Sequence, residues 1–271
     1  MRGLIVTIDD FGAASAVNEA VERGHREGIV TAASLMVSGS ACADAVQRAQ
    51  RLPRLGVGLH VVLADGRPVL PAGHIPHLVG PDGRFHSDMV RTAFAIALSP
   101  SARAQMRAEV AAQFAAFAAT GLRLDHVNAH KHFHLHPMIA SAILEIGPRY
   151  GMRAMRVPHE RETPPALRWW SRRLAKRLRR AGILVNDEVV GLRWSGAFDA
   201  GRMRQALGAL PDGLTELYCH AASADSYPGS AAGYRYRDEF AALLDPGVHA
   251  ALAASGTRHG CFGDFTIATT G

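Results

Sequence analysis

Residues 3–12 read Gly-Leu-Ile-Val-Thr-Ile-Asp-Asp-Phe-Gly. The first six form a short apolar run rich in β-branched residues, which is typical of a strand buried on both faces of a parallel sheet. The run stops at Asp9 and Asp10, and in α/β folds the carboxyl end of a strand is where ligands bind. The two aspartates either belong to such a site or form the turn before a helix predicted at 16–27. Ser15 could cap that helix, which would leave both carboxylates free for a site.

Strand and helix patterns alternate along the rest of the chain. Further strands are predicted at 30–37, 55–62, 122–129, 153–157, 184–190, 215–220 and 261–268. This alternation predicts a parallel sheet, and seven or eight strands predict an α/β fold of the TIM-like (β/α) barrel type, complete or incomplete. A long loop at 65–90 is expected to cover the site. The 271 residues, 48% of them hydrophobic, are expected to form one domain spanning 1–271.

Histidine is concentrated in one stretch, Asp-His-Val-Asn-Ala-His-Lys-His-Phe-His-Leu-His-Pro at 125–137. His130, His132, His134 and His136 occupy alternate positions, and an extended backbone sends alternate side chains to one face. We therefore predict one wall of imidazoles that can hold a cation, because neutral imidazole is the commonest metal ligand. The alternative is a solvated histidine-rich loop that binds metal only opportunistically.

Other polar residues also stand where predicted strands end. Asp9 and Asp10 follow the first strand, His60 ends the third, and His130 follows the fourth. His220 ends a later strand. A single histidine at such a position is more often a satisfied core residue. Because the carboxyl ends of parallel strands meet at one edge, the coincidence of four clusters predicts a catalytic rim.

One carboxylate and two imidazoles would form a three-ligand site with an open coordination position, the pattern of hydrolytic zinc centres. Asp10 is the predicted ligand and Asp9 the general base, because the attacking water needs a carboxylate that is not a ligand. His220 is the candidate acid for the leaving amine. His132 and His134 are expected to orient ligands or to contact substrate. Among imidazoles we expect one divalent ion, Zn²⁺ rather than Mg²⁺, because Mg²⁺ prefers oxygen ligands.

Five separated blocks resemble, in order and spacing, the YdjC-like carbohydrate deacetylases. They are Thr-Ile-Asp-Asp-Phe-Gly at 7–12, Gly-Ile-Val-Thr at 28–31, Val-Gly-Leu-His at 57–60, His-Val-Asn-Ala-His-Lys-His-Phe-His at 126–134 and Glu-Leu-Tyr-Cys-His at 216–220. The resemblance is closest to the branch associated with hopanoid biosynthesis, HpnK. It implies a distorted (β/α) barrel like that of polysaccharide deacetylases, a divalent metal, and hydrolysis of an N-acetyl group from an amino sugar. By motif position, it implies a metal at Asp10, His60 and His130 and acid–base roles for Asp9 and His220.

Two positions depart from the pattern of that family. Asn128 stands where an aspartate is common, and it can orient a neighbour but cannot act as a base. Ala221 stands where a proline often follows the late histidine, so the loop that carries His220 is expected to be set differently. Neither departure removes a proposed ligand.

The net charge of +6 comes from one segment, because seven basic residues and no acidic ones lie between Arg168 and Arg180. We therefore expect no nucleic-acid partner. A helix over 167–181 would align one apolar stripe formed by Leu167, Trp170, Leu174, Leu178 and Ala181. Such a helix either lies on an anionic membrane surface or packs its stripe on the barrel as an ordinary surface helix.

Three cysteines without zinc-clasp spacing, a short apolar N-terminal run and interrupted apolar stretches predict a cytoplasmic protein. Peripheral contact with the inner membrane surface through 167–181 is one option. The predicted function is metal-dependent deacetylation of an N-acetylglucosamine group on a hopanoid lipid. The alternatives are a deacetylase of soluble N-acetylated sugars such as chito-oligosaccharides and a non-catalytic metal- or lipid-binding protein. A homo-oligomer is compatible with the sequence, which does not set the oligomeric state.

Overall fold

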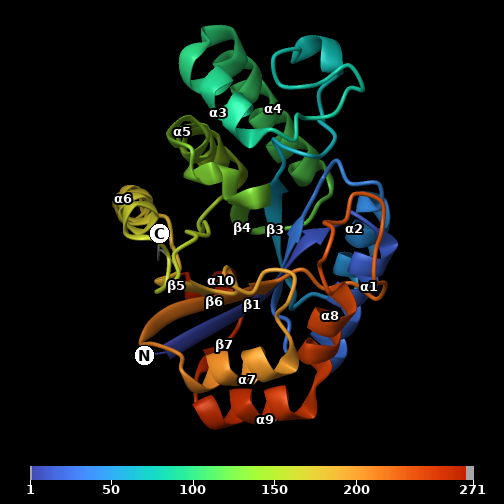
Figure 1. Ribbon diagram of the computed structural model, residues 1–271, viewed down its shortest axis with the longest axis vertical. Helices are drawn as coiled ribbons and strands as arrows, with labels where there is room; N and C mark the ends of the chain where they lie inside the picture. Colours follow the sequence, from blue (N-terminus) through green and yellow to red (C-terminus); the bar gives the residue numbers. More distant parts are fainter. Residues whose placement is uncertain (1, 267–271) are drawn as a thin grey trace.

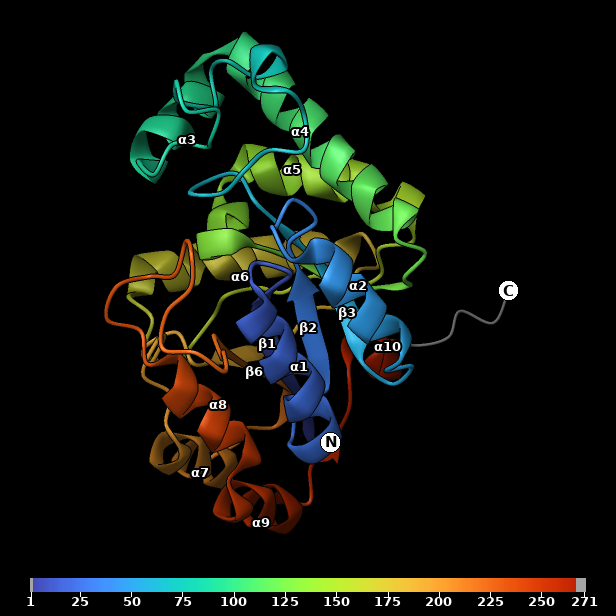
Figure 2. The same cartoon turned by 90° about the vertical axis from the view of Figure 1, so that its right-hand side faces the viewer.

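The computed structural model describes residues 2–266, and its centre is a parallel β-sheet (Figures 1 and 2). The strands follow the order β4-β3-β2-β1-β6-β5, and a short β7 also pairs with β1. They are β1 (Arg2–Phe11), β2 (Ala32–Leu35), β3 (Gly56–Val61), β4 (Leu124–Ala129), β5 (Glu188–Val190), β6 (Gly213–Cys219) and β7 (Arg258–His259). All pairs are parallel, so the carboxyl ends of these strands gather at one end of the sheet.

Helices surround this sheet on several sides. They are α1 (Ser15–Glu27), α2 (Cys42–Gln50), α3 (Met89–Leu98), α4 (Pro100–Ala119), α5 (Pro137–Ile146), α6 (Pro165–Arg180), α7 (Ala200–Gly208), α8 (Tyr236–Leu244), α9 (Pro246–Ser255) and α10 (Phe262–Phe265). The short 3₁₀ segments are η1 (Ala72–His74), η2 (His130–Leu135) and η3 (Gly147–Tyr150). In Figure 1, α3, α4 and α5 lie above the sheet, α1 and α2 to its right, α6 to its left, and α7 and α9 below it. No helix within residues 2–266 is both long enough and apolar enough to cross a bilayer.

The sheet forms an incomplete barrel, as predicted. Its edge strands are β4 and β5, and two single parallel bridges, Val127 of β4 with Met155 and Ala154 with Leu184, extend the wall beyond β4. The predicted strand at 153–157 therefore takes part in the barrel wall without forming a regular ladder. One physical reason is that the side chain of Asn186 bonds the backbone N–H and C=O of Val157, each over 2.8 Å, in place of a neighbouring strand.

Strand β1 separates two buried apolar clusters. Leu4, Val6 and Ile8 belong to the larger one, which packs the sheet against the helices. Ile5 points the other way and packs with the smaller cluster of Ala32, Ala154, Leu214 and Phe262. Since alternate strand residues face opposite sides, this small cluster occupies the barrel interior, and the polar side chains near the strand ends lie above it.

Two local predictions were wrong, and one helix was missed. Residues 262–265 form α10 instead of a strand, and positions 267 and 268 of that prediction lie outside the described residues. Helix α3 was not predicted. The N-cap of α1 is Ala14, without a side-chain hydrogen bond, so Ser15 is not the cap.

Candidate metal centre

The two aspartates at the end of β1 line one cavity, although adjacent strand residues normally point to opposite faces. The pairing of β1 with β2 changes register between Ile8 and Phe11, and Asp10 has a φ of 63°. This left-handed conformation is uncommon for a residue with a side chain and persists where the surrounding structure enforces it. It allows the carboxylates of Asp9 and Asp10 to share the mouth of the barrel.

Asp10, His60 and His130 meet at one point of this cavity. Oδ1 of Asp10 lies 3.2 Å from Nε2 of His60 and 3.2 Å from Nδ1 of His130. One candidate ligand atom from each residue lies within 4.8 Å of the other two. The residues come from the ends of β1 and β3 and from the start of η2, which are far apart in sequence. They form a triad that could hold one metal ion.

The hydrogen bonds around His60 leave a lone pair directed toward Asp10. Nδ1 of His60 lies 2.7 Å from Oδ1 of Asn128, an atom that can only accept, so Nδ1 carries the proton of the neutral ring. Nε2 is buried and has no hydrogen-bond partner among the described residues. Two electron-rich atoms at 3.2 Å repel each other unless positive charge lies beside them. The donor set therefore fits a divalent cation held by imidazole and carboxylate ligands.

The electrostatic surroundings of His60 also favour positive charge. Burial acts to lower the pKa of His60, but the negative charges of the Asp9 and Asp10 carboxylates and the hydrogen bond to Asn128 outweigh it, so this pKa is raised. Burial acts to raise the pKa of Asp10, and His130 and His60 reverse that effect and lower it well below its usual value. A negative carboxylate at the centre of two imidazoles is the arrangement that a bound cation would stabilise.

Asn128 orients His60 from the neighbouring strand. The two residues are partners in the register of β3 and β4, so their side chains leave the sheet side by side. The amide nitrogen of Asn128 donates to Oδ1 of Asp9 and to Oγ of Ser34, each over 3.0 Å, which leaves the amide oxygen for His60. An ionised aspartate at position 128 would instead face Asp9 with a second negative charge. Asparagine therefore suits position 128, because its amide nitrogen can donate to Asp9 while its amide oxygen accepts from His60.

A chain of buried hydrogen bonds continues from Ser34 to the barrel floor. Oγ of Ser34 lies 3.1 Å from Nε2 of His126, whose Nδ1 lies 3.0 Å from Oδ2 of Asp125. The carboxylate fixes the proton on Nδ1, so in a neutral ring Nε2 accepts from the serine hydroxyl. Asp125 also accepts the backbone N–H of Gly263 in α10, over 2.7 Å. A Cβ at Gly58 would lie 2.5 Å from the His126 ring, so this close approach needs a glycine.

Arg156 holds Asp9, and the sequence interpretation did not identify it. The guanidinium is fully buried, with Nη1 2.5 Å from Oδ2 of Asp9 and Nη2 3.0 Å from Oδ1. Its remaining bonds go to Glu216, at 2.7 and 2.8 Å. Burial acts to raise the pKa of Asp9, but Arg156 outweighs it and holds this pKa well below its usual value. Asp9 is thus an ionised carboxylate that is bound by Arg156 and is not one of the three grouped ligand candidates.

His220 lies directly after β6 and lines the same cavity. Its backbone N–H donates to Oε2 of Glu239 over 2.6 Å, and its Nδ1 lies 3.4 Å from Oγ of Ser195. Tyr218 and Tyr234 flank the ring edge to face, with centroid distances of 5.5 and 5.3 Å. The backbone bond and the two tyrosines fix the orientation of this imidazole.

The predicted wall of imidazoles is wrong. Residues 130–135 form η2, in which Lys131 and His132 have φ values of 53° and 55°, so the period of an extended strand does not apply. Lys131 pairs with Asp65, which also has a positive φ, of 55°. Three left-handed residues around one ion pair indicate that tertiary contacts impose this conformation.

The other histidines of the stretch serve different purposes. Nε2 of His132 lies 3.2 Å from the hydroxyl of Tyr218 on the cavity wall, so substrate contact stays open to it. Nε2 of His134 donates to the carbonyl oxygen of Arg156 over 3.0 Å, and burial together with Arg156 lowers the pKa of His134 to about 3. That ring is neutral and supports the arginine. His136 caps α5 by accepting a backbone N–H of its first turn.

The cavity at the barrel mouth has a volume of about 630 Å³. Loop residues Asp65 and Arg84 reach it, so part of the predicted loop at 65–90 lies at the site. Tyr234, Tyr236 and Ser195 complete its polar wall. No local pattern in the sequence marks these residues, because they come from separate loops and from the start of α8.

The family described as YdjC-like protein matches residues 3–254 of the chain. The chain belongs to the YdjC family. Relatives of this YdjC chain include a protein named carbohydrate deacetylase from Geobacillus stearothermophilus, 28% identical over 95% of each chain. Another of that name from Mus musculus is 35% identical over 83% of this chain and 77% of its own length. A third from Brevibacillus brevis is 39% identical over 147 residues, so the match spans only about half of either chain, 54% and 56%.

Two solved structures share the fold of this YdjC family member. A proposed cellobiose-phosphate cleavage protein from Enterococcus faecalis V583 has a TM-score of 0.80 at 21% identity, over 98% of this chain and 99% of that one. An uncharacterised protein from Agrobacterium tumefaciens C58 has a TM-score of 0.52 at 13% identity, over 97% and 89%. At these identities the likeness establishes the fold alone.

Proposed function

We propose that this YdjC family member is a metal-dependent carbohydrate N-deacetylase. The observation that carries the proposal is the separation of the two carboxylates at the end of β1. Asp10 joins His60 and His130 in the triad, whereas Asp9 is bound by Arg156 and lies outside it. The relatives named carbohydrate deacetylase support hydrolysis of an acetylated sugar. A protein that only binds metal would need the triad but not the second carboxylate.

Each residue of the site has a separate role in the proposed hydrolysis. When bound, a divalent cation supplies Lewis acidity, which makes water more acidic and polarises the acetamide carbonyl. Asp9, oriented by Arg156 and Asn128, accepts a proton as water adds to the carbonyl carbon. His220 donates a proton to the nitrogen as the C–N bond breaks, and the products are acetate and a free amine. Two imidazoles in the donor set favour Zn²⁺ over Mg²⁺.

The proposed substrate is an N-acetylglucosamine group on a hopanoid lipid, at the inner surface of the cell membrane. The cavity volume of about 630 Å³ falls within the range of small-molecule sites. Tyr218, Tyr234 and Tyr236 offer apolar ring faces together with hydroxyl groups, which suits the mixed surface of a sugar. Soluble chito-oligosaccharides would use the same catalytic residues and are the second candidate.

The protein loaded with Zn²⁺ is expected to release acetate from an N-acetylglucosaminyl hopanoid faster than from chito-oligosaccharides. Asp9→Asn should reduce acetate release by about 10²- to 10⁴-fold, the usual contribution of a general base, while the metal content stays at the wild-type level. Asp225→Asn is the matched control, because the side chain of Asp225 is 82% exposed. Product mass and elemental analysis provide the two readouts.

If the soluble sugar releases acetate faster than the hopanoid, chito-oligosaccharides become the proposed substrate in place of the lipid. No acetate from either substrate, or full activity of Asp9→Asn, would contradict the proposed function.

A further inference from the structure

Exposed apolar side chains are concentrated on three helices. Eight large hydrophobic side chains are exposed in the described part of the chain, and seven of them lie on α3, α5 and α6. On α3, Val90, Phe94 and Leu98 are 66%, 62% and 78% exposed and lie one helical turn apart. A helix of a globular protein normally hides such a stripe, so the outer face of α3 requires an apolar or interfacial partner.

The start of α6 adds a second exposed apolar group. Leu167, Trp169 and Trp170 are 43%, 56% and 38% exposed, whereas Leu174 and Leu178 in the second half of α6 are buried. Of the predicted apolar stripe, Leu174 and Leu178 therefore pack on the protein, whereas Leu167 and Trp170 are exposed. The exposed side chains at the start of α6 are available to another partner.

The three helices adjoin one another on one side of the barrel. In both views α3 lies above α5, and α5 lies above α6 (Figures 1 and 2). Helix α4 packs against both α3 and α5. Arg177 of α6 donates to Oγ of Ser141 in α5 over 2.8 Å. The exposed apolar groups thus belong to one connected layer.

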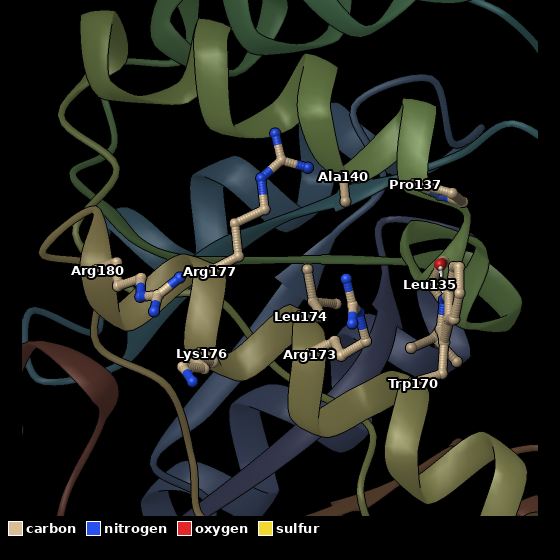
Figure 3. Close-up of a pocket in the computed structure, with 9 residues that line it drawn as sticks. All are labelled: Leu135, Pro137, Ala140, Trp170, Arg173, Leu174, Lys176, Arg177 and Arg180. Atoms are coloured by element: carbon tan, nitrogen blue, oxygen red, sulfur yellow. Dashed lines mark hydrogen bonds between the residues drawn. The ribbon is translucent and has the colours of Figure 1, made fainter.

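The cations of α6 are available to an anionic partner. Among the described residues, the salt bridges of α6 involve only Arg179, which pairs with Asp187 at 2.7 Å. A groove of about 540 Å³ runs between α5 and α6. Figure 3 shows Arg173 and Arg177 extending from α6 toward α5 beside the apolar Leu174 and Ala140. Cations over an apolar floor match the phosphate and glycerol region of a phospholipid bilayer.

We propose that α3 and α6 together dock this protein on an anionic phospholipid bilayer. The apolar side chains of α3 and the tryptophans of α6 enter the interface, and the cations of α6 bind headgroup phosphates. Charge complementarity favours this partner, because two copies of the chain would bring their basic helices together. A nucleic acid would leave the stripe of Val90, Phe94 and Leu98 without an apolar partner.

The docking face, formed by the exposed side chains of α3 and α6, is connected to the metal triad. Nε1 of Trp170 donates to the carbonyl oxygen of Leu135 over 2.7 Å, at the end of the η2 segment that begins with His130. The docking helix is therefore fixed to the segment that carries a candidate ligand. This use of the face rests on the proposed lipid-linked substrate, but the docking itself needs no turnover.

The test measures co-sedimentation of the full-length protein with phosphatidylcholine vesicles, with and without phosphatidylglycerol. Wild-type protein is expected to bind the anionic vesicles and to dissociate as the salt concentration rises. Arg172→Glu/Lys176→Glu should weaken binding by roughly 30-fold or more, and Phe94→Ser/Leu98→Ser by roughly 10-fold. Arg51→Glu/Arg54→Glu makes the same change of charge on exposed residues near α2 and should bind like wild type.

All variants should keep wild-type acetate release from a soluble sugar, because no changed residue lines the catalytic cavity. Equal binding of wild type and the α3 and α6 variants would overturn the proposal. Equal weakening by the Arg51/Arg54 control would also overturn it, since net charge alone would then explain binding. A dimer that dissociates when Phe94 and Leu98 are replaced would also overturn the proposal, because the apolar stripe of α3 would then contact a second copy of the chain. Failure of all deacetylation with intact vesicle binding would reject the proposed function and leave the docking face standing.

Discussion

The His130→Ala variant is expected to lose its bound metal and to release acetate on the order of 10³-fold more slowly than wild type. The substitution removes one of the three candidate ligands, and Asp10 and His60 alone provide only two. Lewis-acid stabilisation by a metal is worth several kcal/mol, which corresponds to at least this change in rate. Elemental analysis of the purified variant and an acetate assay measure the two effects separately.

His136→Ala is the matched control, because His136 belongs to the same histidine-rich stretch but caps α5. Loss of that cap should cost about 1 kcal/mol of stability and leave metal content and activity unchanged. A His130→Ala variant with full activity would refute the assignment of the triad. Equal loss of metal in both variants would show that the stretch binds metal without a defined site.

Arg156→Met is expected to lower the free energy of unfolding at pH 7 by about 3–5 kcal/mol, the usual cost of removing one partner from a buried ion pair. Arg156 is fully buried and bonds both Asp9 and Glu216, so its loss leaves two buried carboxylates without their cation. Urea denaturation measures the difference. Arg161→Met is the control, because the side chain of Arg161 is 70% exposed and lies 3.9 Å from its partner Glu188.

The deficit of Arg156→Met should shrink as the pH falls from 7 to 5. In the wild type, the pKa of Asp9 is lowered, so its ionised form stabilises the fold above its unfolded pKa of about 3.9. Without Arg156, burial acts on Asp9 without this opposing charge and raises its pKa above the unfolded value. A carboxylate with a raised pKa destabilises the fold when ionised, and protonation at lower pH relieves that cost. A deficit that grows on acidification would contradict this account of the ion pair.

Part of the site could be predicted because polar residues at the carboxyl ends of parallel strands lie close together. Asp10 and His60 follow or end apolar runs, and the carboxyl ends of parallel strands converge whatever the lengths of the connecting segments. Arg156 could not be found in this way, because a buried arginine is explained only by Asp9 and Glu216, which come from two other strands. Its one sequence signal is a charged residue near the end of the predicted strand at 153–157.

Two failures have different physical causes. The alternation of histidines predicted extended backbone, but Lys131 and His132 take left-handed conformations beside the ion pair with Asp65. Tertiary contacts there override a local periodicity. Helix α3 escaped prediction because its apolar residues face both inward, at Ile96, and outward, at Phe94, which obscures the amphipathic period. The same feature makes α3 part of the proposed docking face.

We expect Asp10, His60 and His130 to share one cation, with Asp9 outside its ligands. The most direct measurement is a crystal structure of the zinc-loaded protein, with data recorded above and below the zinc absorption edge. We expect one anomalous peak in contact with these three side chains, with Asp9 still paired to Arg156. A peak bound by Asp9, or a zinc ion held elsewhere with the triad unchanged, would contradict this expectation.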